Sequence, residues 1–233
     1  MIGIVHLAFL TRDKLGLMEL SEYALKNTEI TSSVLSLIKK ARPNWVASVS
    51  AGAINAKSGS GLETDFASNP YGYLKRVEEE MLDSVCRDTA SNLSVGRLWG
   101  ASGLFMPINR AYALSDFIIQ ALETGSIHIS SNHPVFRRYS KADEFLRILE
   151  KTATQDQRTL FDSGGPKVEI QELAELVAQK TKAKIRPRIM RPELASDVYF
   201  PISDQYESLA RQFGVQISSL QELVSAAITS HTR

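Results

Sequence analysis

The chain has 233 residues, a formal net charge of +1 and 43% hydrophobic residues. This length supports one large domain or two small ones, and the near-neutral charge argues against general binding of nucleic acid or of an anionic membrane. The single cysteine, Cys86, excludes an internal disulfide, and the apolar start from Ile2 to Leu10 is too short to span a bilayer. We therefore expect a soluble, cytoplasmic protein.

The first two thirds of the chain alternate short apolar runs with helical stretches, which is typical of a parallel sheet with crossover helices. We expect a strand at 2–8, a helix at 15–41, a strand at 44–50, a helix at 69–88 and a strand at 93–98. The loop between the second strand and the second helix is rich in Gly, Ala and Ser. Helical periodicity places one set of apolar residues on one face of the first helix: Ile30, Val34, Leu37 and Ile38.

The composition shifts after Gly103. We expect further helices at 110–124 and 141–151, an amphipathic helix from about residue 170, and two closing helices, 203–212 and 218–229; short strands are expected at 126–129 and 158–162. Three early strands alone would leave an exposed sheet edge. Either later strands extend this sheet, or a homodimer or partner chain pairs with its open edge.

Tyr71 and Lys75 lie four positions apart at the start of the predicted 69–88 helix. Residues at this spacing share a helical face, so the ammonium is expected beside the phenol. A nearby cation favours phenolate and lowers the tyrosine pKa from about 10, which suits proton transfer near neutrality. The alternative is an ordinary pair on a solvated helix face.

A strand-end serine, a tyrosine and a lysine resemble the working group of the short-chain dehydrogenase/reductase superfamily. The chain also resembles its extended branch, which contains the NAD-dependent nucleotide-sugar epimerases and dehydratases. The resemblance rests on the order and spacing of these segments: Val5–Ala8, Asn27 and its helix, Val46–Ile54, Asn69–Glu79, Arg97–Gly103, Arg137–Glu144, Phe161–Gly165, Arg191–Glu193, Asp204 and Phe213-Gly214.

The resemblance implies an α/β fold with a truncated Rossmann-like parallel sheet, containing only the later strands, in residues 1–103. Residues 104–233 would form a smaller C-terminal α/β substrate domain, with about 136–162 packing back on the Rossmann part. The family's opening Gly-x-x-Gly-x-x-Gly loop is absent from the sequence, and Met1 falls where the fourth family strand would begin.

By resemblance, Tyr71 transfers a proton, and Lys75 lowers its pKa while binding the nicotinamide ribose of NAD or NADP; Ala8 would also contact the cofactor. Ser50 would hydrogen-bond the substrate oxygen. A register shifted by one residue would place Ala51 in that position, and Ser48, on the same strand face, is expected to be structural.

Arg137 and Arg191 resemble the two family arginines that clamp a nucleotide diphosphate, a task that suits the guanidinium fork. Arg138 would replace Arg137 after a one-residue shift. The alternative reading is a surface ion pair with Glu144 or Glu193. The histidines show no metal-ligand spacing, and His6, inside an apolar strand, is expected to be a satisfied core residue.

Two hypotheses of function remain. The first is an NAD(P)-dependent epimerase, dehydratase or reductase that acts on a nucleotide-linked sugar through Ser50, Tyr71, Lys75 and the two arginines. The second is a non-catalytic, truncated relative that serves as a binding or assembly subunit. The missing phosphate-binding loop motivates the second, because that loop provides the main pyrophosphate site.

Overall fold

The computed structural model describes residues 2–55, 57–58, 61–62, 65–104, 109–155, 158–191 and 193–232. The chain divides into two compact units. The first comprises Met1–Leu98 and Leu146–Asp162, and the second comprises Trp99–Phe145 and Ser163–Arg233. The chain thus leaves the first unit, returns to it within a helix and leaves it again.

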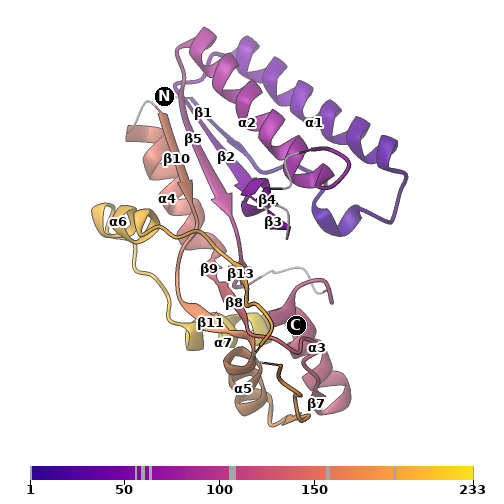
Figure 1. The fold of residues 1–233 in the computed structure, drawn as a ribbon. Helices are drawn as coiled ribbons and strands as arrows, with labels where there is room; N and C mark the ends of the chain where they lie inside the picture. The colour runs from indigo at the N-terminus through magenta and orange to yellow at the C-terminus, as the bar shows by residue number, and fades with distance from the viewer. Residues whose placement is uncertain are drawn as a thin grey trace. The chain divides into compact units, whose positions relative to one another are not determined.

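The first unit is built on a parallel sheet with the strand order β1-β2-β5-β10 (Figure 1). These strands are β1 (Gly3–His6), β2 (Trp45–Ala51), β5 (Asn92–Leu98) and β10 (Arg158–Asp162). The predicted α/β class and its parallel Rossmann-like sheet are therefore confirmed. A later strand, β10, extends the sheet at one edge, while β1 forms the other edge.

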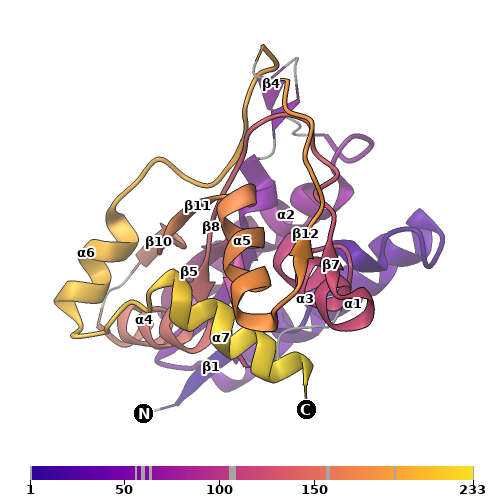
Figure 2. The same ribbon diagram turned by 90° about the horizontal axis from the view of Figure 1, so that it is seen from below.

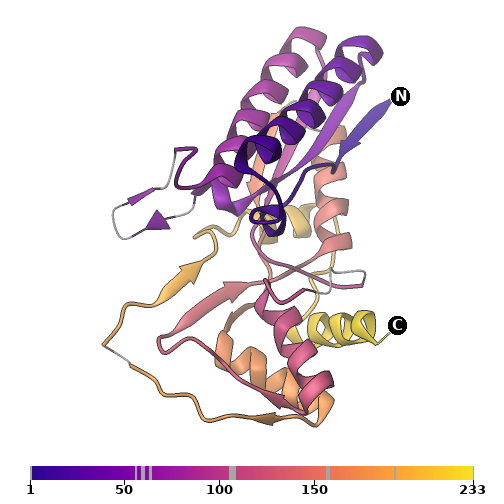
Figure 3. The same cartoon turned by 90° about the vertical axis from the view of Figure 1, so that its right-hand side faces the viewer.

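Helices cover both faces of this sheet. In Figures 1 and 3, α1 (Leu20–Ala41) and α2 (Pro70–Thr89) lie side by side on one face. The helix α4 (Ala142–Gln155), whose larger part belongs to the first unit, covers the opposite face. The central strands β2 and β5 are therefore mostly buried.

The alternation of side chains along β5 explains this layering. Leu93 and Val95 point toward α1 and α2, where they join the core formed with Leu82 and other apolar residues. Ser94, between them, points the other way, and its hydroxyl lies 2.6 Å from that of Thr152 in α4. The apolar residues of β5 thus face α1 and α2, and the serine between them faces α4.

The first helix begins later than predicted. It starts at Leu20 rather than at 15, after a short 3-10 turn, Arg12–Lys14. Of the apolar residues predicted to share one face, Val34 and Ile38 are buried, while Leu37 is 50% exposed. Leu37 faces a shallow groove between α1 and the edge strand β1, where no further strand of the described chain covers it.

The predicted 51–68 loop holds short ordered pieces. A 3-10 turn, Gly52–Asn55, follows β2 directly. Two two-residue strands, β3 (Lys57–Ser58) and β4 (Gly61–Leu62), pair in antiparallel fashion. The 3-10 turn contacts α2.

The second unit contains a small mixed sheet that the sequence did not predict. Its central strand, β8 (Val135–Arg138), runs antiparallel to β11 (Lys167–Glu169) and parallel to β13 (Asp197–Tyr199). Strands of three or four residues give too short a pattern to recognise from periodicity. Four shorter strands form two further pairs: β6 (Ala101–Ser102) with β9 (Ser140–Lys141), and β7 (Ser126–Ile127) with β12 (Lys184–Ile185).

Helices supply most of the core of the second unit. As Figure 2 shows, α5 (Ile170–Thr181) and α7 (Leu220–His231) lie close together, and both contact α3 (Ala113–Thr124). The amphipathic helix expected from about residue 170 is α5, whose apolar residues Ile170, Leu173, Ala174 and Val177 are buried. The closing helices, α6 (Gln205–Gln212) and α7, are confirmed. Among the described helices, none has both the length and the hydropathy needed to cross a membrane.

Candidate active site

The start of α2 is fixed by the segment that precedes Tyr71. Asn69 caps the helix, because its side-chain oxygen accepts a hydrogen bond from Gly72 N at 3.0 Å. Its amide nitrogen donates to Ala53 O at 2.7 Å and so ties α2 to the turn after β2. Pro70 stands in the first turn, where its missing N–H costs nothing. A Cβ on Gly72 would collide with Ala53 O, so glycine allows this close approach.

Phe9 contacts both members of the predicted proton-transfer pair. Its ring centroid lies 6.0 Å from that of Tyr71, with an edge-on angle of 61°. The same ring lies 3.9 Å from the Lys75 ammonium nitrogen, which is cation–π geometry. Sequence reasoning missed Phe9. The available signal was its position directly after Ala8, at the end of the predicted strand.

Lys75 is buried, which excludes the alternative of a pair on a solvated helix face. Only 4% of the residue is exposed. Its ammonium donates to Val49 O at 2.9 Å and to Glu78 Oε2 at 2.7 Å. Burial lowers the pKa of Lys75 below its usual value, while the charges of Glu78 and, to a smaller extent, Glu79 oppose that shift.

Glu78 links Lys75 to the edge strand. Its second oxygen, Oε1, lies 2.8 Å from His6 Nε2 and 3.4 Å from Thr31 Oγ1. Burial alone would raise the pKa of Glu78, but the hydrogen bond from His6 and the charge of Lys75 hold it below the usual value. His6 is thus a satisfied core residue, as expected, and it also belongs to this network.

The hydroxyl of Ser50 is a buried polar group of the first unit that lacks a hydrogen-bond partner among the described residues. Ser50 lies near the carboxyl end of β2, and 3% of it is exposed. A buried, unpaired hydroxyl costs about 1–3 kcal/mol, so it is rarely retained without a use. The preceding residue, Val49, gives its carbonyl to Lys75, which connects Ser50 to the start of α2 through one peptide unit.

Ala8 is exposed and lines the groove beside β1. The segment that follows it is held by α1, because Asn27 Oδ1 accepts from Leu10 N at 2.8 Å and Tyr23 donates to Leu10 O at 2.6 Å. The two contacts fix the chain on the C-terminal side of Phe9. The position of the Phe9 ring is therefore supported from α1 as well as from α2.

In the second unit, Arg137 is paired with an acidic residue other than Glu144 or Glu193. Its guanidinium donates to Asp197 Oδ2 at 2.6 Å, and 26% of its side chain is exposed. It also lies 5.7 Å from the Tyr199 ring, which in turn packs against Trp99 at 4.9 Å. Sequence reasoning identified the arginine but missed this aromatic pair.

The other arginine candidates of this unit have different surroundings. Arg191 is exposed, and its backbone nitrogen donates to Asn132 O at 2.7 Å. Arg138 donates to Ser203 O at 3.2 Å and lies 3.8 Å from Glu207. No hydrogen bond or ion pair among the described residues joins Arg137 to Arg191.

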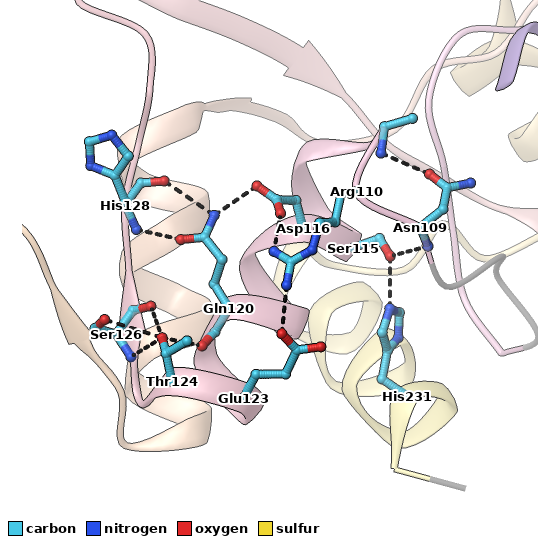
Figure 4. A network of polar contacts seen from close by, with 11 residues as sticks. Asn109, Arg110, Ser115, Asp116, Gln120, Glu123, Thr124, Ser126, His128 and His231 are labelled. Carbon is cyan, nitrogen blue, oxygen red and sulfur yellow. Dashed lines mark hydrogen bonds and ion pairs between the residues drawn. The ribbon is translucent and has the colours of Figure 1, made fainter. Parts of the chain in front are cut away.

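A second polar cluster in this unit has a different role. Ser115 Oγ lies 2.8 Å from His231 Nε2, a contact drawn in Figure 4, and His231 Nδ1 lies 2.8 Å from Ala227 O. Ser115 is only 3% exposed, and it also accepts from Asn109 N at 3.2 Å. The histidine thus has a carbonyl rather than a carboxylate partner, and the buried serine connects α3 to the end of α7. We assign this cluster to stability.

Comparisons with solved structures identify the fold as that of nucleotide-sugar epimerases and dehydratases. The UDP-glucose 4-epimerase of Thermotoga maritima, solved with UDP-glucose, is 18% identical with a TM-score of 0.77, and the match covers 99% of this chain and 77% of that one. The UDP-N-acetylglucosamine 4-epimerase of Methanobrevibacter ruminantium M1 is 17% identical with a TM-score of 0.76, and coverage is 99% and 76%.

The solved structure of a dehydratase is also similar to this chain. A double mutant of the dTDP-glucose 4,6-dehydratase from Streptomyces venezuelae, solved with NAD, is 16% identical with a TM-score of 0.73; the match covers 99% of this chain and 73% of that one. No protein-family model and no curated protein matches the sequence. Since these identities are low, the comparisons establish the fold alone.

Proposed function

We propose that this chain is an NAD(P)-dependent oxidoreductase of the epimerase/dehydratase type, acting on a nucleotide-linked sugar. The observation that carries the proposal is the buried, unpaired hydroxyl of Ser50 at the carboxyl end of β2. Parallel α/β sheets bind ligands at this end of their strands. The solved structures of the same fold include complexes with UDP-glucose and with NAD, which supports this substrate and cofactor class.

In the proposed mechanism, Ser50 donates its hydrogen bond to the reacting sugar oxygen. Tyr71 takes the hydroxyl proton as that carbon is oxidised, and Lys75 favours the phenolate by its charge. The nicotinamide cofactor, when bound, supplies the hydride acceptor. Lys75, Tyr71 and Ala8 would hold it; the Lys75 ammonium already bonds Val49 O and Glu78 Oε2 and lies over the Phe9 ring.

The second unit would bind the nucleotide. Arg137 and Arg191 are proposed to contact the diphosphate, with Arg138 as the alternative to Arg137. Asp197 holds Arg137 in place and keeps its fork ordered, while the rings of Tyr199 and Trp99 offer apolar surface beside it. A cytoplasmic location remains a prediction from the sequence.

Tyr71→Phe tests the proposal. This change removes the proton-transferring hydroxyl and leaves the ring contact with Phe9. We expect the wild-type chain to bind NAD or NADP in calorimetry and to convert at least one sugar nucleotide from a panel of UDP- and dTDP-sugars. The variant should keep the binding and lose turnover by about 10²-fold or more. Wild-type protein that binds neither cofactor at millimolar concentration would refute the proposal.

The second candidate function is that of an assembly subunit, and the edge strand β1 favours it. β1 carries no charged residue, and Ile2, Val5 and Leu7 are each more than half exposed, unlike the charged edges that resist association. The proposed partner is a second copy that pairs through β1. Light scattering tests it: a dimer that Val5→Glu dissociates, and that Ile202→Glu leaves intact, would support assembly, whereas a wild-type monomer would contradict it.

A further inference from the structure

Lys75 has more partners than proton transfer from Tyr71 requires. Its side chain is 5% exposed, and its ammonium is fixed from three elements: by the Val49 carbonyl of β2, by Glu78 of α2 and by the ring of Phe9 after β1. A flexible lysine held in this way has lost most of its rotamer freedom. The position of the Lys75 ammonium is therefore set by the surrounding residues.

Glu78 is the only charged group among these partners, and it is itself restrained. Its side chain is 1% exposed. Because a carboxylate can only accept, Nε2 of His6 carries the hydrogen of the 2.8 Å contact, and Thr31 donates to the same oxygen at 3.4 Å. One carboxylate oxygen thus faces Lys75, while the other is held by β1 and α1.

The neighbouring glutamates show that this arrangement is specific to one position. Glu79 turns to Arg97, with contacts of 3.0 and 2.7 Å, and Glu80 is exposed. In a helix, position i+3 lies on the face of Lys75, which here is the inward face. The run of three glutamates therefore contains one buried partner for Lys75, one partner for Arg97 and one solvated residue.

We propose that Glu78 is a positioning residue for Lys75: held by His6 and Thr31, its carboxylate fixes the ammonium between the Val49 carbonyl and the Phe9 ring. The role that Lys75 then performs rests on the proposed function, but its placement does not. The network extends from the edge strand β1 to α2. A substitution in β1 is therefore expected to alter the surroundings of Lys75 without a direct contact to Tyr71.

Glu78→Gln tests this proposal, and Glu80→Gln is its matched control on the same helix. The readout is the pKa of Lys75, followed by NMR of labelled lysine side chains. Gln keeps the shape and removes the charge, so the Lys75 pKa should fall by about one or more, the effect of an opposite charge at this range. Glu79, whose charge also acts on Lys75, and His6, which bonds Glu78, are the other titratable groups of this network. Glu80→Gln should leave that pKa unchanged.

Rescue and a milder change complete the test. Glu78→Asp retains the charge and should restore part of the shift, and Thr31→Val, which removes one hydroxyl only, should lower the Lys75 pKa by less than Glu78→Gln does. If Glu78→Gln does not fold, Thr31→Val and Glu78→Asp decide the question. A Lys75 pKa that is the same in all folded variants would overturn the proposal.

The same samples separate this inference from the proposed function. A Lys75 pKa that follows Glu78 in a protein that binds no NAD or NADP would uphold the positioning role and refute the enzymatic one. If the protein is active, the alkaline limb of its kcat/KM profile should move to lower pH in Glu78→Gln. An active Glu78→Gln variant with an unchanged profile and an unchanged Lys75 pKa would refute the positioning role alone.

Discussion

The two units hold their candidate functional residues in different ways. In the first unit, Lys75 and Glu78 are nearly inaccessible, and their charges are balanced within the protein. In the second, Arg137 keeps 26% of its side chain exposed, and its partner Asp197 keeps 44%. Buried charges must be paired when the protein folds, whereas exposed ones can exchange partners with a ligand. In the proposed function, the first unit would provide a preorganised reaction centre and the second an adaptable anion site.

The largest effect should come from breaking the buried pair. Lys75→Met leaves the Glu78 carboxylate buried with one cationic partner fewer, so the free energy of unfolding should fall by about 3–5 kcal/mol in urea denaturation. The control is Lys26→Met, which removes an ion pair whose members are 46% and 49% exposed. That change should cost about 0.5 kcal/mol or less. Equal losses in the two variants would contradict the contrast between buried and exposed charges.

The pH dependence of the stability loss in Lys75→Met tests whether the buried charges cause it. In the wild type, the lowered pKa of Glu78 means that its contribution is complete above the usual glutamate value of about 4.3 and is lost as the pH falls through the folded-state value. In Lys75→Met, burial of Glu78 is less well compensated, so its pKa rises. The difference in unfolding free energy between the two proteins should therefore shrink from pH 7 toward pH 4. A difference that is independent of pH would show that charge is not its cause.

Ser50→Ala should separate stability from activity. Because the Ser50 hydroxyl has no partner in the described chain, its removal should leave the free energy of unfolding unchanged or raise it by about 1 kcal/mol. Sugar-nucleotide turnover should fall by about 10²–10³-fold, as for the loss of one preorganised donor. Ser94→Ala is the control, because Ser94 bonds Thr152 at 2.6 Å and its loss should cost about 1 kcal/mol. A destabilised Ser50→Ala variant would argue for a structural hydroxyl.

A smaller effect is expected in the second unit. Arg137→Lys keeps the charge but loses the fork that bonds Asp197 and is proposed to bond phosphate. The affinity for UDP, measured by calorimetry, should fall by about tenfold, which corresponds to one charge-assisted hydrogen bond. The unfolding free energy should change little, because the pair is partly solvated. If Arg138→Lys weakens UDP binding and Arg137→Lys does not, the proposed phosphate contact belongs to Arg138 instead of Arg137.

Sequence reasoning was most accurate where local chemistry decides the structure. The predicted start of α2 at Asn69 agrees with the helix Pro70–Thr89, because an asparagine cap and a first-turn proline act within four residues. The range of β10, Arg158–Asp162, was also correct, although its place beside β5 came only from the structure. Local sequence signals predict where helices and strands lie, whereas the pairing of strands that are distant in the sequence is known only from the structure.

The rest of the candidate site depends on contacts that no local pattern encodes. The Lys75–Glu78 contact lies within one helix turn, but its burial depends on Phe9 and on His6, 72 positions away from Glu78. Tyr199 approaches Arg137 only because β13 pairs with β8. For the same reason, the periodicity of α1 could not predict that Leu37 is half exposed, since its exposure follows from the edge position of β1.

The most direct test of the central claim is a single-turnover measurement of reduced nicotinamide absorbance. Wild-type protein and Ser50→Ala are mixed with saturating NAD or NADP and a panel of UDP- and dTDP-sugars. Reduced cofactor should form in the wild type with at least one sugar nucleotide, and it should form more slowly in Ser50→Ala, by about 10²-fold or more, at equal cofactor affinity. No reduced cofactor in the wild type, with cofactor and sugar nucleotide both shown to be bound, would contradict the proposed function.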